Sequence, residues 1–116
     1  MRLHHLAFRT AQLDALVGFY RDVIGLPVVK ETGRSTWLRL DDAVLMIERA
    51  GDGEPAVPAG SLELVALAVD PVQRTSLTAR LAARGIAVEG ETEHTTYFRD
   101  PDGRRVAVST YPLTGG

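Results

Sequence analysis

A small number of side chains in this 116-residue sequence have the chemistry to bind or transform a small molecule. His5 can accept a proton or ligate a metal, and Glu48 can act as a carboxylate base. Arg9 and Arg99 can hold a carboxylate or phosphate through paired N–H donors. Tyr97 offers a ring for stacking and a hydroxyl for hydrogen bonding. For each arginine, ordinary solvation at a strand end is an equally good interpretation.

Composition excludes several other kinds of site and partner. The absence of cysteine rules out disulfides, thiolate zinc sites, iron–sulfur clusters and cysteine nucleophiles. A net charge of −2 argues against nucleic acid and anionic membranes as partners. No apolar run approaches the roughly 20 residues of a membrane span, and we expect a cytoplasmic protein. The use of arginine in place of lysine, with Lys30 as the exception, is typical of a GC-rich bacterial gene.

The elements that must position these residues follow from apolar spacing and turn residues. Bounded or alternating apolar stretches predict strands over residues 2–9, 27–29, 35–40, 43–48, 62–69, 86–88, 95–99 and 104–109. Apolar residues at helical spacing predict helices over residues 12–24 and 71–84. Gly25 and Gly85 follow these helices, where a left-handed C-terminal residue is favoured.

The order of elements occurs twice along the chain, at a nearly constant lag. The matched segments are Leu3–Leu13 with Leu62–Val72 at a lag of 59 residues, Gly25 with Gly85 at 60, and Trp37–Ile47 with Phe98–Val108 at 61. Such a lag, maintained across helix, turn and strand, indicates an internal duplication rather than two unrelated α+β stretches.

The duplication predicts an α+β fold built from two tandem βαβββ modules within one domain, residues 1–116. The modules cover residues 1–50 and 61–116. A Gly/Pro-rich stretch over residues 51–60 has the composition of a linker between them.

Alternation along the strands predicts a uniformly apolar face, which should pack under the helices, and a mixed face with polar groups among apolar ones. A mixed face of this kind is typical of a small-molecule site. On the strand predicted over residues 35–40, alternation places Thr36 and Leu38 on the mixed face. The predicted ligand-binding residues on the mixed face are His5, Arg9, Leu38, Met46, Glu48, Leu64, Tyr97, Arg99, Ala107 and Ser109.

Two sequence strings, FYRDVIGL at Phe19–Leu26 and YFRDPDG at Tyr97–Gly103, together with His5, resemble the vicinal-oxygen-chelate superfamily. That superfamily includes glyoxalase I, fosfomycin-resistance transferases, extradiol dioxygenases and bleomycin-resistance binding proteins. The resemblance covers almost the entire chain. It implies two βαβββ modules, each a curled mixed sheet, around a cavity, and a homodimer.

Metal-dependent members of that superfamily hold a divalent ion through His or Glu at four strand positions. The resemblance places these positions at His5, Met46, Leu64 and Ala107, of which only His5 offers a suitable donor. Glu48 lies two residues past Met46, on the same strand face. His5 and Glu48 together would make a weak site at best. We therefore expect neither a metal site nor a cofactor.

These observations leave three hypotheses. The first is a protein that binds a small organic molecule, resembling the bleomycin-resistance type that sequesters an antibiotic or natural product. The second is a glyoxalase-like lyase, isomerase or transferase with a degenerate or metal-independent site, in which His5 or Glu48 is the base and Arg9 or Tyr97 stabilises an oxyanion. The third is a subunit with a vestigial cavity. We expect a homodimer in every case, because small sheets leave edges that neighbours cover.

Overall fold

The computed structural model describes residues 1–113 and consists of two compact units. The first unit, Met1–Ala56, is called module 1, and the second, which begins at Val57, is called module 2. The boundary between them falls within the stretch over residues 51–60 that the sequence marks as a linker. Each unit has the element order βαβββ, and the predicted α+β class is confirmed.

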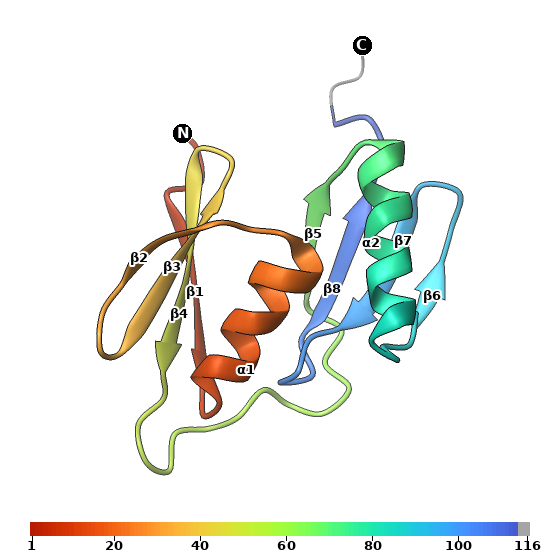
Figure 1. Cartoon of the computed structure of the whole chain (residues 1–116). Coiled ribbons are helices and arrows are strands. Elements are labelled where there is room, and N and C mark those ends of the chain that lie inside the picture. Colours follow the sequence, from red (N-terminus) through yellow and green to blue (C-terminus); the bar gives the residue numbers. More distant parts are fainter. Residues whose placement is uncertain (114–116) are drawn as a thin grey trace. The chain divides into compact units, whose positions relative to one another are not determined.

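The two modules have the same sheet topology (Figure 1). In each sheet the first strand pairs in parallel with the last, and the other neighbours are antiparallel; the strand orders are β1-β4-β3-β2 and β5-β8-β7-β6. Module 1 contains β1 (His5–Thr10), α1 (Leu13–Gly18), η1 (Phe19–Ile24), β2 (Val28–Glu31), β3 (Ser35–Leu40) and β4 (Ala43–Arg49). Module 2 contains β5 (Leu64–Ala68), α2 (Pro71–Ala83), β6 (Gly90–Glu91), β7 (Thr95–Arg99) and β8 (Arg105–Ser109).

The helix predicted over residues 12–24 has two parts. An α-helical turn, α1, continues into the wider π-helical turn η1. The N–H groups of Gly25 and Leu26 both donate to the carbonyl of Tyr20, at 3.1 and 2.9 Å, and so close the wide turn. Gly25 then leaves the helix at φ 94°, in the left-handed region that glycine adopts without strain.

The strand predicted over residues 86–88 is wrong, because this segment completes the end of α2 instead. The N–H of Ile86 donates back to the carbonyl of Leu81 at 2.9 Å. Pairing with β7 starts only at Glu89, whose N–H donates to the carbonyl of Tyr97 at 2.7 Å, and β6 follows as a two-residue strand.

Helix α2 begins where its sequence signals lie. The Asp70 carboxylate accepts the N–H of Gln73 at 2.7 Å, and the Gln73 side chain accepts the N–H of Asp70 at 2.9 Å. This reciprocal capping box precedes Pro71, whose missing N–H costs nothing at the first helical position. None of the helices within residues 1–113 is long and apolar enough to cross a membrane.

The core of each module lies between its helix and the apolar face of its sheet. In module 1 the ring of Phe8 on β1 lies 5.7 Å from that of Tyr20 in η1. In module 2 the Arg74 side chain of α2 donates to the Thr96 hydroxyl on β7 at 3.0 Å. The core residues that are almost fully buried include Leu16, Val23, Leu45, Ile47, Leu77, Leu81, Phe98, Val106 and Val108.

The placement of Thr36 and Leu38 on the mixed face is wrong. In the β3–β4 pairing Leu38 lies opposite Leu45, and Thr36 lies on that same side. Leu38 has 0% of its surface exposed, as a core residue should. Trp37, which lies opposite Met46, occupies the mixed face instead.

The error arises from the lag between the modules. Trp37 opposes Met46 and Tyr97 opposes Ala107, so Trp37 corresponds to Tyr97 rather than to Phe98. The chain from Tyr97 to its partner Ala107 is one residue longer than the chain from Trp37 to its partner Met46. Strands β4 and β8 therefore correspond at a lag of 61 residues, whereas β3 and β7 correspond at a lag of 60. Because side chains alternate along a strand, this one-residue shift moves every β3 side chain to the other face.

This assignment predicts unequal costs for two truncations. Leu38→Ala leaves a cavity in a closed core and should lower the free energy of unfolding by about 2–5 kcal/mol. Met46→Ala removes a partly exposed side chain from the mixed face and should cost less. Urea unfolding of both variants measures the difference, and an equal or larger cost for Met46→Ala would contradict the assignment.

Candidate functional site

The mixed face of module 1 is the sheet face opposite its helix. Parallel pairing of β1 with β4 puts Arg9 beside Glu48 and Ala7 beside Met46. The register of β3 adds Trp37 to the same face. The side chains on this face are His5, Ala7, Arg9, Ser35, Trp37, Arg39, Val44, Met46 and Glu48.

The mixed face of module 2 contains the side chains that alternation predicts for it. Tyr97 lies opposite Ala107, and Arg99 lies opposite Arg105. The predicted site residues Leu64, Tyr97, Arg99, Ala107 and Ser109 all lie on this face, which also holds Ala66, Ala68, Thr95 and Arg105.

Both mixed faces present an aromatic ring at the same position, with a cation over it. The ammonium nitrogen of Lys30 lies 4.6 Å from the centre of the Trp37 ring system. The guanidinium carbon of Arg105 lies 4.4 Å from the centre of the Tyr97 ring. Trp37 and Lys30 are not among the residues that the sequence predicts for the site, although a lag of 60 residues between β3 and β7 pairs the two rings.

Arg9 is bound by a carboxylate of its own module. Its Nε and Nη2 donate to the two oxygens of Glu54, at 3.0 and 2.7 Å. This paired hydrogen bond, helped by the N–H of Gly51, lowers the pKa of Glu54 to about 2. The same bond raises the pKa of Arg9. The paired N–H donors of Arg9, which the sequence suggests for an anionic ligand, are therefore already occupied by Glu54.

Arg99 is occupied in the same way. Its Nε and Nη2 both donate to the carboxylate of Glu89, and its Nη1 donates to the carbonyls of Ser61 and Gly103, at 2.6 and 3.2 Å. The hydrogen bond from Arg99 is the main cause that lowers the pKa of Glu89. Arg99 thus joins the loops around the β7–β8 hairpin.

His5 and Glu48 share a face but not a site. His5 lies opposite Val44, four residues before Glu48 on the same strand, which separates the two backbones by about 13 Å. The exposed His5 imidazole lies 2.9 Å from that of His4, whereas Glu48 lies 3.9 Å from Arg9. A metal site or a catalytic pair built from both residues is therefore not formed.

The residues at the four expected metal positions do not fit a divalent ion. On module 1 these are the His5 imidazole and the Met46 thioether, and on module 2 they are the hydrocarbon side chains of Leu64 and Ala107. Hard divalent ions require several oxygen or imidazole donors. Within residues 1–113, no group of three or more His, Asp or Glu side chains is close enough to hold a metal. The hydroxyl of Ser109 is engaged with that of Thr95 at 2.9 Å.

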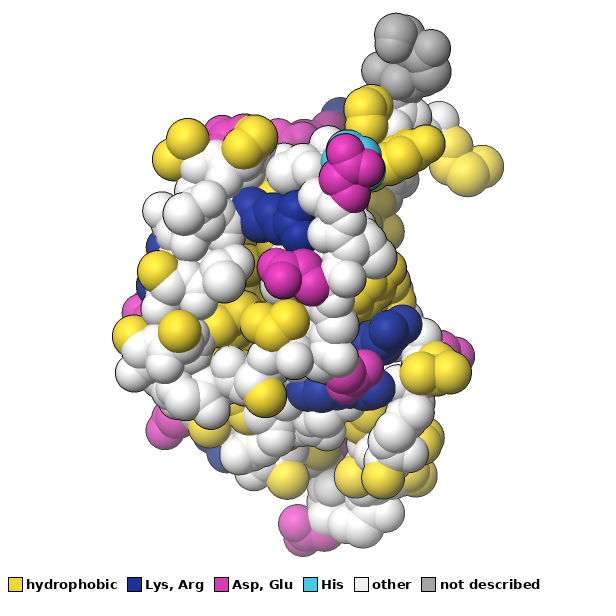
Figure 2. Space-filling model, turned by 90° about the vertical axis from the view of Figure 1, so that its right-hand side faces the viewer, with side chains coloured by type: hydrophobic (Ala, Val, Ile, Leu, Met, Phe, Trp, Pro, Cys, Tyr) yellow, Lys and Arg dark blue, Asp and Glu magenta, His cyan; other side chains and the backbone are white. Residues whose placement is uncertain are grey.

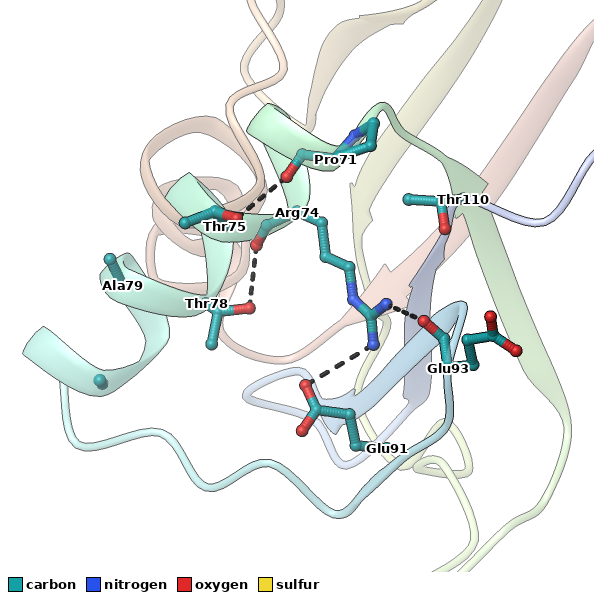
Figure 3. Close-up of a pocket in the computed structure, with 9 residues that line it drawn as sticks. Pro71, Arg74, Thr75, Thr78, Ala79, Glu91, Glu93 and Thr110 are labelled. Atoms are coloured by element: carbon teal, nitrogen blue, oxygen red, sulfur yellow. Dashed lines mark hydrogen bonds and ion pairs between the residues drawn. The ribbon is translucent and has the colours of Figure 1, made fainter.

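A groove of about 700 Å³ lies on the other side of module 2, between α2 and the β6–β7 hairpin, and sequence analysis did not predict it. Basic and acidic side chains lie side by side in this hollowed surface (Figure 2). Arg74 points into the groove toward Glu91 and Glu93 (Figure 3), and it donates to the carbonyls of Thr92 and Glu93 at 2.9 and 2.6 Å. With the Thr96 bond, these contacts make Arg74 a structural tie between helix and hairpin.

Comparison with known families gives a match over nearly the whole chain. Residues 2–108 match the family model described as the Glyoxalase/Bleomycin resistance protein/Dioxygenase superfamily.

Solved structures agree with that match. A lactoylglutathione lyase from Agrobacterium tumefaciens is 25% identical, with a TM-score of 0.75 over 99% of this chain and 97% of its own. The oxidase ChaP-H2 is 19% identical, with a TM-score of 0.81 over 100% and 98% of the two chains. A variant of the fosfomycin resistance protein FosX from Listeria monocytogenes, in complex with Mn(II) and a dihydroxypropylphosphonic acid, is 15% identical, with a TM-score of 0.81 over 97% and 94%.

The Arg9–Glu54 pair predicts a specific pH dependence of stability. Because the pKa of Glu54 falls from 4.5 to about 2 on folding, its contribution is complete above pH 4.5 and is lost as the pH falls toward 2. Glu54→Gln should remove this part of the profile. Thermal unfolding from neutral pH down to the acid limit measures it, with Glu63→Gln as an exposed control. Identical profiles for Glu54→Gln and the unmodified protein would contradict the role of the pair.

Proposed function

Because the chain belongs to the glyoxalase/bleomycin resistance protein/dioxygenase superfamily, we propose that it binds a small organic molecule without a metal ion at the positions that relatives use. The observation that carries this proposal is the donor set. Of the four expected ligand positions only His5 retains a nitrogen or oxygen donor, and Glu48 lies too far along the sheet to complete a site with it. Binding requires only a shaped surface with a few placed polar groups.

The mixed faces have that composition. Trp37 and Tyr97 provide rings, Met46 and Leu64 provide apolar surface, and the serine and threonine hydroxyls provide hydrogen-bonding groups. This combination supports sequestration of an antibiotic or natural product, in the manner of the bleomycin-resistance members. The proposal extends to a single domain over residues 1–116 that acts as a cytoplasmic, bacterial homodimer.

A second candidate is a glyoxalase-like lyase, isomerase or transferase that works without a metal. The likeness to a lactoylglutathione lyase and the exposed imidazole of His5 favour it. Since His5 and Glu48 are far apart, His5 alone would serve as the base.

The first prediction from this proposal concerns metals. Mg²⁺, Mn²⁺, Ni²⁺ and Zn²⁺ should leave the melting temperature of metal-free protein unchanged, because too few donors converge on one point. Scanning calorimetry with each ion measures the shift, and His5→Ala is the matched control. A Mn²⁺-dependent rise that disappears in His5→Ala would overturn the metal-free proposal.

The second prediction concerns organic ligands. A panel of aromatic natural products and antibiotics should contain compounds that raise the melting temperature in the presence of EDTA. Trp37→Leu and Tyr97→Leu should weaken that binding, because each removes a ring from a mixed face. Tyr111→Leu, at an aromatic residue 64% exposed outside both faces, should leave it unchanged.

The same panel separates binding from turnover. Compounds recovered unchanged after incubation support sequestration. Conversion of a compound that persists in EDTA and is lost in His5→Ala would establish the enzymatic candidate instead. A panel in which no compound is bound or converted would contradict both.

A further inference from the structure

Charged side chains gather at one end of the mixed face of module 2. Arg99 and Arg105 lie opposite each other on β7 and β8. Glu89, from the loop before β6, accepts hydrogen bonds from both guanidinium groups. Two cations thus share one carboxylate, and the cluster retains one positive charge. The neighbouring carboxylates Asp100 and Asp102 both pair with Arg104, at 3.4 and 2.9 Å, and neither of these ion pairs involves Arg105.

The two arginines of this cluster are used differently. Arg99 donates hydrogen bonds to Glu89 and to backbone carbonyls in two loops. Arg105 donates only its Nε to Glu89, at 3.2 Å. Within residues 1–113, neither terminal amino group of Arg105 has a hydrogen-bond acceptor. One quarter of the Arg105 side chain is exposed, so solvent reaches it.

Arg105 is nevertheless held in place. Its guanidinium carbon lies over the Tyr97 ring, 4.4 Å from the ring centre, and its Nε donates to Glu89. These two contacts orient the planar guanidinium, and its two terminal amino groups form the open edge. Because the side chain is already ordered, binding a ligand there costs less side-chain entropy. Arg9 lacks such an open edge, because Glu54 occupies both its Nε and Nη2.

Exposed apolar side chains lie on the same sheet face, on β5, which flanks β8 on the side away from Tyr97. Leu64 is the strand partner of Arg105 and is 40% exposed, although a core position would bury it. Ala66, the next residue on that face of β5, is also exposed and lies opposite Ala107. The face therefore offers a fixed cation over β7 and an exposed apolar strip on β5, with β8 between them.

We propose that the open edge of Arg105 binds the anionic group of a small amphipathic ligand, a carboxylate or a phosphonate, whose apolar part lies against Leu64 and Ala66. This inference rests on the proposed function and deepens it, since it states the chemical class of the ligand. Tyr97 and Glu89 act as positioning residues for the guanidinium.

Benzoate and phenylphosphonate are suitable probes, and benzamide is the neutral match for benzoate. Isothermal titration of the full chain should show binding of both anions and much weaker binding of benzamide. Arg105→Gln should weaken benzoate binding at least tenfold, because a charge-assisted hydrogen bond is lost. Arg84→Gln, at an exposed residue after α2 and outside both mixed faces, should leave it unchanged.

Further variants separate recognition from folding. Tyr97→Phe keeps the ring under the guanidinium and should bind benzoate as the unmodified protein does, whereas Tyr97→Leu should bind less tightly. Arg105→Lys keeps the charge without the planar fork and should lie between the unmodified protein and Arg105→Gln. Melting temperatures and amide spectra of every variant confirm that the fold is intact.

Three results would overturn the inference: equal benzoate binding by Arg105→Gln and the unmodified protein, equal binding of benzamide and benzoate, or no binding of either anion up to its solubility limit. Neutral compounds from the natural-product panel that still bind would then show that small-molecule binding stands and that only the anionic class is wrong. Failure of that panel as well would remove the proposed function itself.

Discussion

The parallel pairing of the first and last strand in each module is the constraint on which the other features of the structure depend. It joins β1 to β4 and β5 to β8. In each module the helix that follows the first strand returns the chain to the same sheet. The helix covers one face, which becomes the core, and leaves the other as the mixed face, where polar side chains lie among apolar ones. Because paired residues share a face, these registers decide which side chains can meet.

Carboxylates of the chain itself bind the paired N–H donors of two arginines on the mixed faces. Glu54 accepts the paired hydrogen bonds of Arg9, and Glu89 accepts those of Arg99. These two strand arginines therefore hold loops in place and do not offer their paired donors to a ligand. Arg105 differs from both because an aromatic ring, rather than a second set of acceptors, holds it.

The chain has the family fold, and two of the positions that the resemblance assigns to metal ligands carry hydrocarbon side chains. Leu64 and Ala107 occupy strand positions with the required orientation but carry no lone pairs. Under the proposed function, binding does not need those donors, because apolar surface and aromatic rings recognise organic molecules directly.

The sequence by itself determined the class of fold, the duplication and most of the elements. Strong local signals explain this success: the capping box at Asp70, the glycines that end both helices, and apolar periods of two and of about 3.6 residues. It also determined the mixed face of module 2, where alternation and register agree.

Only the tertiary structure decided the register of β3 and the partners of the arginines. The chain between paired residues is one residue shorter in the β3–β4 hairpin than in the β7–β8 hairpin, and this register places Leu38 in the core and Trp37 on the mixed face. The bonds from Arg9 to Glu54 and from Arg99 to Glu89 join residues 45 and 10 positions apart. Such contacts have no periodic signature, because they depend on where loops return in space rather than on the spacing of residues along a helix or strand.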